Sequence, residues 1–389
     1  MSYRKYLTDE ILDHYLHIQT DTEGGGIFNF FNPDSSLFKT DKDVWRQGGA
    51  MWVYAMAYRL VDQRQEYLDI CEHIFEFIKR LPMAGGGLPY RVTRNADSIV
   101  NEQDIGLYSD CFCAMGCAQY YRVSEREDVK EMAERLFKNM YVRYFSVLEA
   151  PQTFKSSVPS KLFSLNVAML AGAQFVRNAG ICVEEANILA HACVERMANA
   201  GHIDNEKRLV RELLPIYGYE LSDRENYCCP GHVYEAAWLV LCESEYRCDE
   251  KMRELGKKLL DYAMPAGFEE KTALIPTYRS VENPDCVEDN TGSILSWPQQ
   301  EAIVAYRLAH NIFNNERYLY LSQTIERSAY EYFADREQGR WYVSIKKGSL
   351  PVSMRNDREG HIEGPFHLER MLLALITIHE HGSIIEYIH

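Results

Sequence analysis

The chain has 389 residues, 46% of them hydrophobic and 25% charged, the balance of an ordinary globular protein with a sizeable core. Its net charge of −15 argues against nucleic acid and anionic membrane as partners, because both require a basic face. The first residues, Met1–Lys5, lack the apolar core of a signal peptide, and no apolar run approaches membrane length. The eleven cysteines show no paired CxxC spacing, which favours reduced thiols in a cytoplasmic protein.

Helical periodicity recurs along the whole chain and predicts about twelve helices. In chain order they are expected at Asp9–Gln19, Trp45–Val61, Gln65–Lys79, Gly106–Arg122, Arg126–Lys138, Lys161–Arg177, Val183–Ala198, His232–Glu245, Asp249–Tyr262, Pro298–His310, Glu316–Phe333 and Pro365–His379. No long disordered or low-complexity linker divides them. Residues 1–389 are therefore predicted to form a single catalytic domain.

The predicted helices alternate in character. The odd-numbered ones carry charges on one face, as in Gln65–Phe75, and this stripe suits an outer helix with one face in water. The even-numbered ones are richer in Ala, Gly, Cys and Met, as in Tyr108–Ala118, and suit packing on both sides. Paired in order, the twelve helices make six helical hairpins, each with one outer and one inner helix. Six such hairpins predict an all-α fold, an (α/α)6 barrel. A stacked helical solenoid is the alternative.

The loops before the even-numbered helices favour the barrel, because solenoid turns are short. They are long and rich in Gly, Tyr and Arg, as in Thr22–Phe30, Gly85–Arg91 and Gly339–Ser344, and some are expected to form short β-hairpins. Long loops gathered at one end of a rigid scaffold are where functional sites are usually built.

Unusual polar and aromatic residues cluster where the even-numbered helices begin. In an inner ring of parallel helices, these beginnings would open on the same mouth. Indole faces suit the C–H face of a sugar ring, while amides and carboxylates suit its hydroxyls. Two imidazoles brought together from distant helices could move a proton on and off carbon. The residues concerned are Trp45, Arg46, Tyr108, Asn166, His232, Glu235, Trp297, Gln299, Glu301 and His367.

Each feature by itself also has a purely structural interpretation. A histidine at a helix N-terminus is more often capped or packed than catalytic, and His232 with Glu235 is a common i, i+3 surface pair. Trp297 followed by proline could simply begin a helix. No HExxH or dense His/Asp run is present, so no metal site is predicted. The shared location of all these segments is what favours a functional site.

Three segments in order resemble the N-acylglucosamine 2-epimerase superfamily, which includes cellobiose 2-epimerases and mannose isomerase. They are Pro230–Leu239 with His232, Glu235 and Trp238, then Trp297–Ala302, then Phe366–Arg370. Asp34–Trp52 is similar to the family's N-terminal segment and Leu107–Phe112 to its fourth helix, so the resemblance spans nearly the whole chain. It implies an (α/α)6 barrel and a homodimer. It also implies catalytic roles for His232 and His367, with Glu235 and Glu301 as the carboxylates that orient and tune the imidazoles.

The chain also departs from the family pattern. The family commonly has an arginine that binds sugar oxygens where this chain has Gly49, and Arg46 lies one turn earlier. Met169 stands where cellobiose epimerases and isomerases carry a histidine, which is closer to the acylamino-sugar epimerases. A basic residue and a first tryptophan are replaced by Ile294 and Ser296.

The expected reaction is sugar epimerisation or aldose–ketose isomerisation at C2 of a reducing-end aldose of the N-acyl-hexosamine, mannose or glucose type. His232 and His367 would exchange the proton through an enediolate, without metal or cofactor. Two alternatives remain. One is a glycoside or unsaturated uronyl hydrolase that uses Asp110 with Glu235 or Glu301. The other is a non-catalytic sugar-binding protein.

Overall fold

The computed structural model describes most of the chain. The described residues are 2–32, 34–83, 87–99, 106–149, 162–214, 226–264, 273–282, 293–335, 340–346, 351, 362–382 and 387. Of the loops considered above, Gly85, Gly86 and Gly339 lie outside these ranges.

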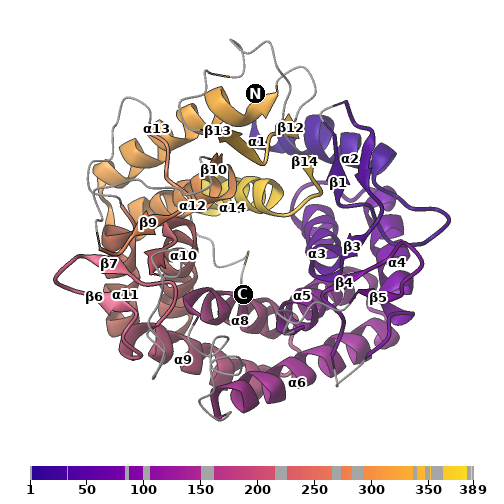
Figure 1. The fold of residues 1–389 in the computed structure, drawn as a ribbon, viewed down its shortest axis with the longest axis horizontal. Coiled ribbons are helices and arrows are strands. Elements are labelled where there is room, and N and C mark those ends of the chain that lie inside the picture. Colours follow the sequence, from indigo (N-terminus) through magenta and orange to yellow (C-terminus); the bar gives the residue numbers. More distant parts are fainter. Residues whose placement is uncertain are drawn as a thin grey trace.

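Six helices form a closed inner ring (Figure 1). Each contacts the next in chain order, and the last packs against the first, so the ring closes on itself. This closure excludes the solenoid and confirms the (α/α)6 barrel. The inner helices are α3 (Val44–Leu60), α5 (Leu107–Ser124), α8 (Phe163–Asn178), α10 (Pro230–Arg247), α12 (Trp297–Phe313) and α14 (His367–His381).

The outer ring covers the inner one, each outer helix lying against an inner neighbour (Figure 1). Its five long helices are α4 (Gln65–Lys79), α6 (Glu127–Glu149), α9 (Val183–Asn199), α11 (Glu250–Ala263) and α13 (Glu316–Phe333). The sixth outer element is a continuous helical segment made of α1 (Tyr3–Lys5), the π-helix η1 (Tyr6–Leu12) and α2 (Asp13–Ile18). All twelve expected segments are helical within the described residues; Lys161, expected to begin the sixth, lies outside them. The first begins six residues earlier than expected, and the fifth runs on to Glu149.

Small residues let the inner helices approach closely. A Cβ added at Gly48 of α3 would lie 2.3 Å from the backbone carbon of Phe112, and one at Gly116 of α5 would lie 2.4 Å from the Gly48 oxygen. These two glycines therefore permit backbone contact between α3 and α5. The even-numbered helices are rich in Ala, Gly and Cys because such close packing requires small side chains.

Short strands connect the helices, all paired antiparallel. Strand β14 pairs with β1, which joins the segment before the last inner helix to the one before the first. The bounds are β1 (Phe30–Phe31), β2 (Leu37–Lys39), β3 (Lys42–Asp43), β4 (Arg91–Val92), β5 (Ser98–Ile99), β6 (Ile203–Asp204), β7 (Leu209–Val210), β8 (Tyr227–Cys228), β9 (Arg279–Ser280), β10 (Ser293–Leu295), β11 (Ala334–Asp335), β12 (Arg340–Trp341), β13 (Ser344–Lys346) and β14 (Ile362–Glu363).

Tyr387, near the end of the chain, is fully buried inside the ring. Its ring lies 5.7 Å from the rings of both Trp52 and Phe175, and its hydroxyl donates to the Arg370 carbonyl oxygen at 3.2 Å. The ten cysteines within the described ranges are free thiols, and eight of them are buried. No helix in the described part of the chain combines the length and the apolar character needed to span a membrane.

Candidate active site

The first turns of the inner helices open on one cavity with two adjoining lobes. The larger lobe has a volume of about 400 Å³ and the smaller about 270 Å³. Four residues line both lobes: Trp45, His232, Trp297 and His367. Tyr108 and Ser164 line the smaller lobe, so all six inner helices contribute. The expected common mouth of these helices is where the structure places the cavity.

His367 stands at the start of α14 and is anchored by a buried carboxylate. Its Nδ1 lies 3.0 Å from Oε1 of Glu301, a side chain of α12 that also accepts from Trp238 Nε1 at 2.9 Å. Burial would raise the pKa of Glu301, but Arg370 and His367 outweigh it and hold the pKa well below its usual range. Glu301 is thus a buried carboxylate bonded to His367.

Glu235 hydrogen-bonds Arg370, and the carboxylate bonded to His232 is a different one. Oε1 of Glu235 lies 2.6 Å from Nη2 of Arg370, which is also 2.6 Å from Oε1 of Glu301. Arg370 is 1% exposed and bridges the two carboxylates. An i, i+3 pair on one helix face can turn to different partners, and here the guanidinium from α14 attracts Glu235. This residue still lines the smaller lobe.

The carboxylate that holds His232 is Glu212, which sequence reasoning missed. Its Oε2 lies 2.8 Å from Nδ1 of His232. Burial would lower the pKa of His232, but Cys229 and Glu212 outweigh it and raise the pKa well above its usual value. Glu212 follows β7 and belongs to none of the predicted helices, so neither periodicity nor a motif singled it out.

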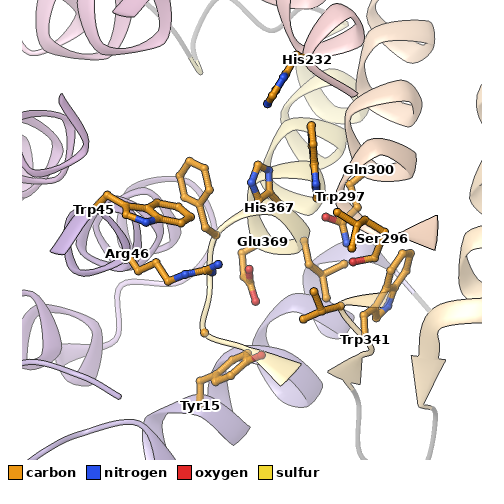
Figure 2. A pocket seen from close by; sticks show the side chains of 15 residues that line it. Tyr15, Trp45, Arg46, His232, Ser296, Trp297, Gln300, Trp341, His367 and Glu369 are labelled. Carbon is orange, nitrogen blue, oxygen red and sulfur yellow. The ribbon is translucent and has the colours of Figure 1, made fainter. Parts of the chain in front are cut away.

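Trp297 lies against both imidazoles. Its ring centroid is 5.0 Å from that of His232 and 5.5 Å from that of His367, with interplanar angles of 36° and 33°. Figure 2 shows the three rings together at the centre of the cavity. The indole therefore packs beside both imidazoles in the cavity.

Gly231→Ala should displace Trp297 and lower kcat by roughly 10–10²-fold, since small misplacements of reacting groups carry such costs. A Cβ at Gly231 would lie 2.4 Å from two atoms of the indole, which must move. Gly256→Ala is the matched control: its Cβ would meet Leu241 at 2.7 Å from the outer helix α11, and it should affect stability alone. Steady-state kinetics of both variants test this, and a wild-type kcat in Gly231→Ala would contradict it.

Phe366 occupies the space beside Gly49. A Cβ at Gly49 would lie 2.9 Å from the Phe366 ring, which also packs 5.0 Å from Phe112 and 6.5 Å from Trp45, measured between centroids. These aromatic rings form a wall next to His367. A side chain at Gly49, where the resemblance leads us to expect arginine, would have to displace the Phe366 ring.

Gly49→Arg should therefore lower kcat/KM at least about tenfold, because the new side chain displaces Phe366, the residue before His367. Kinetics with the best substrate measure this. An increase in kcat/KM would show that the family arginine can be restored here.

Arg46 and Tyr108, both expected to bind substrate, line the cavity. Arg46 faces the larger lobe, with its guanidinium carbon 4.3 Å from the Trp45 ring centroid and its Nε 3.6 Å from Oδ2 of Asp43. Tyr108 faces the smaller lobe, where burial raises the pKa of its hydroxyl to about 12. Figure 2 shows Arg46 and Trp45 across the larger lobe from Trp341.

Asn166 and Gln299, both expected to bind substrate, are absent from the lining of both lobes. Asn166 accepts from the Tyr144 hydroxyl at 2.7 Å and donates to the Leu162 carbonyl at 3.0 Å. Gln299 exchanges two 2.7 Å hydrogen bonds with the main chain of Ile275. Both are buried and hold neighbouring chain segments. A polar residue in a first turn can point away from the mouth, which sequence position does not reveal.

Glu369 is a second carboxyl group that sequence reasoning missed. It is 2% exposed and lines the larger lobe from the first turn of α14. Burial raises its pKa to about 7, although the backbone N–H groups of Glu369 and Phe366 oppose this. Glutamate at this position commonly caps a helix N-terminus by accepting from the N-cap N–H. We assign Glu369 this structural role.

Asp110, the carboxylate of the hydrolase alternative, is bonded elsewhere. It accepts from the Leu88 N–H at 2.8 Å and from Arg143 Nη1 at 2.7 Å, and it is absent from the lining of both lobes. Burial raises its pKa to about 6. Within the described ranges, no group of three or more His, Cys, Asp or Glu side chains is placed to hold a metal ion.

Comparison with known sequences adds a family and named relatives. The family model for N-acylglucosamine 2-epimerase (GlcNAc 2-epimerase) matches residues 25–357. The N-acylglucosamine 2-epimerase of Bos taurus is 24% identical over 94% of this chain and 87% of its own. The cellobiose 2-epimerase of Ruminococcus albus is 23% identical over 96% of this chain and 97% of its own.

Comparison with solved structures supports the fold. A crystal structure of a sugar epimerase from a ruminal bacterium superimposes with a TM-score of 0.77 at 18% identity. The match covers 96% of this chain and 97% of that one. The barrel therefore extends over nearly the full length of both proteins.

Proposed function

Because the chain belongs to the N-acylglucosamine 2-epimerase family, we propose that His232 and His367 move the proton at C2 of a reducing-end aldose. The protein is a carbohydrate epimerase or isomerase. One observation carries the mechanism: each imidazole lines the same cavity and is anchored through Nδ1 by a buried carboxylate, at 2.8 Å and 3.0 Å. That anchoring leaves Nε2 of each ring for the substrate.

The chemistry begins with the open form of the sugar, whose C1 carbonyl makes the C2–H acidic. A neutral imidazole removes this proton, and hydrogen-bond donors stabilise the enediolate oxygen. Return of a proton to the opposite face of C2 completes epimerisation, whereas return to C1 completes isomerisation. We favour 2-epimerisation, with residues 1–389 acting as one catalytic domain.

The surroundings of the two imidazoles suggest different roles. His367 shares the carboxylate of Glu301 with Arg370, whose Nη2 also lies 3.3 Å from Nδ1 of His367. His232 faces Glu212, and its raised pKa favours the imidazolium form at neutral pH. We therefore assign His367 as the first base and His232 as the first acid. With the epimer as substrate, the roles reverse.

Tryptophan rings suit the apolar face of the substrate. Trp45 and Trp297 line both lobes, while Arg46 and Tyr108 offer polar contacts on either side of the histidines. We propose these four as sugar-binding residues, and N-acyl-hexosamines, mannose or glucose-type aldoses as substrates. The reduced cysteines and the family suggest a cytoplasmic homodimer.

Proton NMR in D2O with a panel of sugars tests the function. N-acetylmannosamine, mannose and cellobiose are incubated with the protein, and deuterium uptake at C2 is followed together with the appearance of epimer or ketose. We expect uptake with one class of sugar and no cleavage of glycosidic bonds. Saturable binding without any exchange would support the non-catalytic alternative, and cleavage of cellobiose would support the hydrolase.

A further inference from the structure

Glu212 is held rigidly by its own main chain. Its carbonyl accepts from the Phe163 N–H at 2.8 Å, and its N–H donates to the Tyr227 carbonyl at 3.0 Å. It thereby joins the start of α8 to strand β8, which directly precedes α10. The side chain is buried, with 2% of the residue exposed. Its position is thus determined by three segments that converge beside His232.

The carboxylate connects α8 to α10. Oε1 accepts from the Ser164 N–H at 3.0 Å, in the first turn of α8, while Oε2 meets His232 Nδ1 at 2.8 Å. The Ser164 hydroxyl also bonds Glu212 and Tyr108. A carboxylate at a helix N-terminus satisfies N–H groups that lack helical partners. The Ser164 contact alone could therefore be structural, and the His232 contact is the one that suggests chemistry.

The carboxylates that contact the two histidines differ in their other charged partners. Glu301 shares its charge among Arg370, His367 and the Trp238 N–H. For Glu212, burial would raise its pKa, but His232 and then Ser164 outweigh burial and lower it. The imidazole is therefore the main charge partner of Glu212. A carboxylate with that environment favours a proton on the imidazole it faces.

We propose that Glu212 is a positioning residue of the active site, which fixes the orientation of His232 and keeps it as the proton-bearing member of the histidine pair. This inference rests on the proposed function, because it assigns Glu212 a task within that mechanism. The ionisable groups that face or adjoin His232 are Glu212, Cys229, Tyr108, Glu235 and His367. Of these, Glu212 is the one bonded to Nδ1 at 2.8 Å.

Glu212→Gln removes the negative charge of residue 212 but can keep its hydrogen bond to the first turn of α8. The amide oxygen can still accept from the Ser164 N–H, but the amide nitrogen then faces Nδ1 and favours the tautomer with its proton on Nε2. We expect kcat to fall roughly 10²-fold with KM changed much less. The pKa of His232 should fall, so the activity limb that requires its imidazolium moves to lower pH. Glu212→Asp, which keeps the charge, should recover part of kcat.

Asp249→Asn is the matched control, because Asp249 caps α11 by accepting from the Lys251 and Met252 N–H groups away from the cavity. It should leave the pH profile unchanged. NMR titration of the histidine Cε1–H signals, assigned with His232→Gln, reads the pKa of His232 without relying on turnover. The same pKa in wild type and Glu212→Gln, together with unchanged kcat, overturns the proposal.

A purely structural Glu212 and a non-catalytic histidine pair would give different results. If His232→Ala and His367→Ala are inactive while Glu212→Gln behaves as wild type, Glu212 has only its cap role. If both histidine variants are active, the proposed mechanism itself is wrong. If Glu212→Gln does not fold, Glu212→Asp is measured instead. The aspartate side chain is shorter and reaches less far toward Nδ1 of His232. A His232 pKa and a kcat equal to those of the wild type in Glu212→Asp would therefore also count against the proposal.

Discussion

His367→Ala is expected to lower kcat roughly 10²–10⁴-fold, the usual contribution of a proton-transfer group, and His232→Ala by a similar factor. Both side chains line the cavity, and each is part-exposed to it (26% for His367 and 28% for His232). Truncation removes the reacting imidazole and should leave the helical fold intact, although Glu301 or Glu212 then loses its imidazole partner. Steady-state kinetics and circular dichroism measure the two effects.

Deuterium uptake separates the roles of the two histidines. If His367 removes the first proton, His232→Ala should still wash deuterium into the unreacted sugar at C2 while forming no epimer. His367→Ala should then show neither exchange nor epimer from the same sugar. With the epimer as substrate, the pattern should reverse. If His367→Ala exchanges deuterium into the first sugar and His232→Ala does not, then His232 is the first base and His367 the first acid.

His310→Ala provides the control for the histidine variants. His310 lies in the last turn of α12, with its Nδ1 3.1 Å from the Asn315 carbonyl, far along the helix from Trp297. Its replacement should leave kcat within about twofold, as expected for a surface change away from the site. Wild-type kcat in either His232→Ala or His367→Ala would contradict the mechanism.

Arg370→Met is expected to destabilise the protein by about 3–5 kcal/mol at pH 7, the usual cost of removing one partner from a buried ion pair. Arg370 is 1% exposed and bonds Glu235 and Glu301 at 2.6 Å each. Methionine fills much of the volume but leaves two carboxylates close together without their cation. Urea denaturation measures the change in the free energy of unfolding.

The cost of Arg370→Met should depend on pH. The pKa of Glu301 is lowered in the folded wild type, so its pairing stabilises fully above the unfolded value and is lost as pH falls through the folded one. In the variant, the carboxylates that have lost their cation take up protons more readily in the folded state. Protonation removes their mutual repulsion, so Arg370→Met destabilises the protein less at low pH. The difference in unfolding free energy between the two proteins should therefore shrink from pH 7 to pH 4.

Arg307→Met is the matched control, since Arg307 pairs with Glu326 at 3.2 Å where both side chains remain partly exposed (16% and 15%). Its loss should cost less, and its pH dependence should be weaker. A cost below about 1 kcal/mol for Arg370→Met, or equal costs at pH 7 and pH 4, would refute the bridging role.

Much of the fold was predictable because helical periodicity is a local property. The charged stripe of Gln65–Lys79 and the small residues of Leu107–Ser124 each reflect how many sides of the helix meet protein. This alternation predicted inner and outer helices, and the long loops favoured a closed double ring over a solenoid. Placement of His232 and His367 in first turns then predicted a shared mouth, since parallel inner helices begin at the same end. The cavity lining agrees with that placement.

The sequence alone therefore determined the helices and their alternation between inner and outer positions, whereas tertiary contacts decided that the ring closes. The tertiary structure alone decided which carboxylate each imidazole faces. Glu235 is three residues from His232 yet bonds Arg370, while Glu212, twenty residues away and outside the helices, takes its place. Likewise, the contact between Phe366 and Gly49 forms only once α3 and the start of α14 are packed together. Such pairings depend on distances between remote segments, and periodicity along one segment carries no information about them.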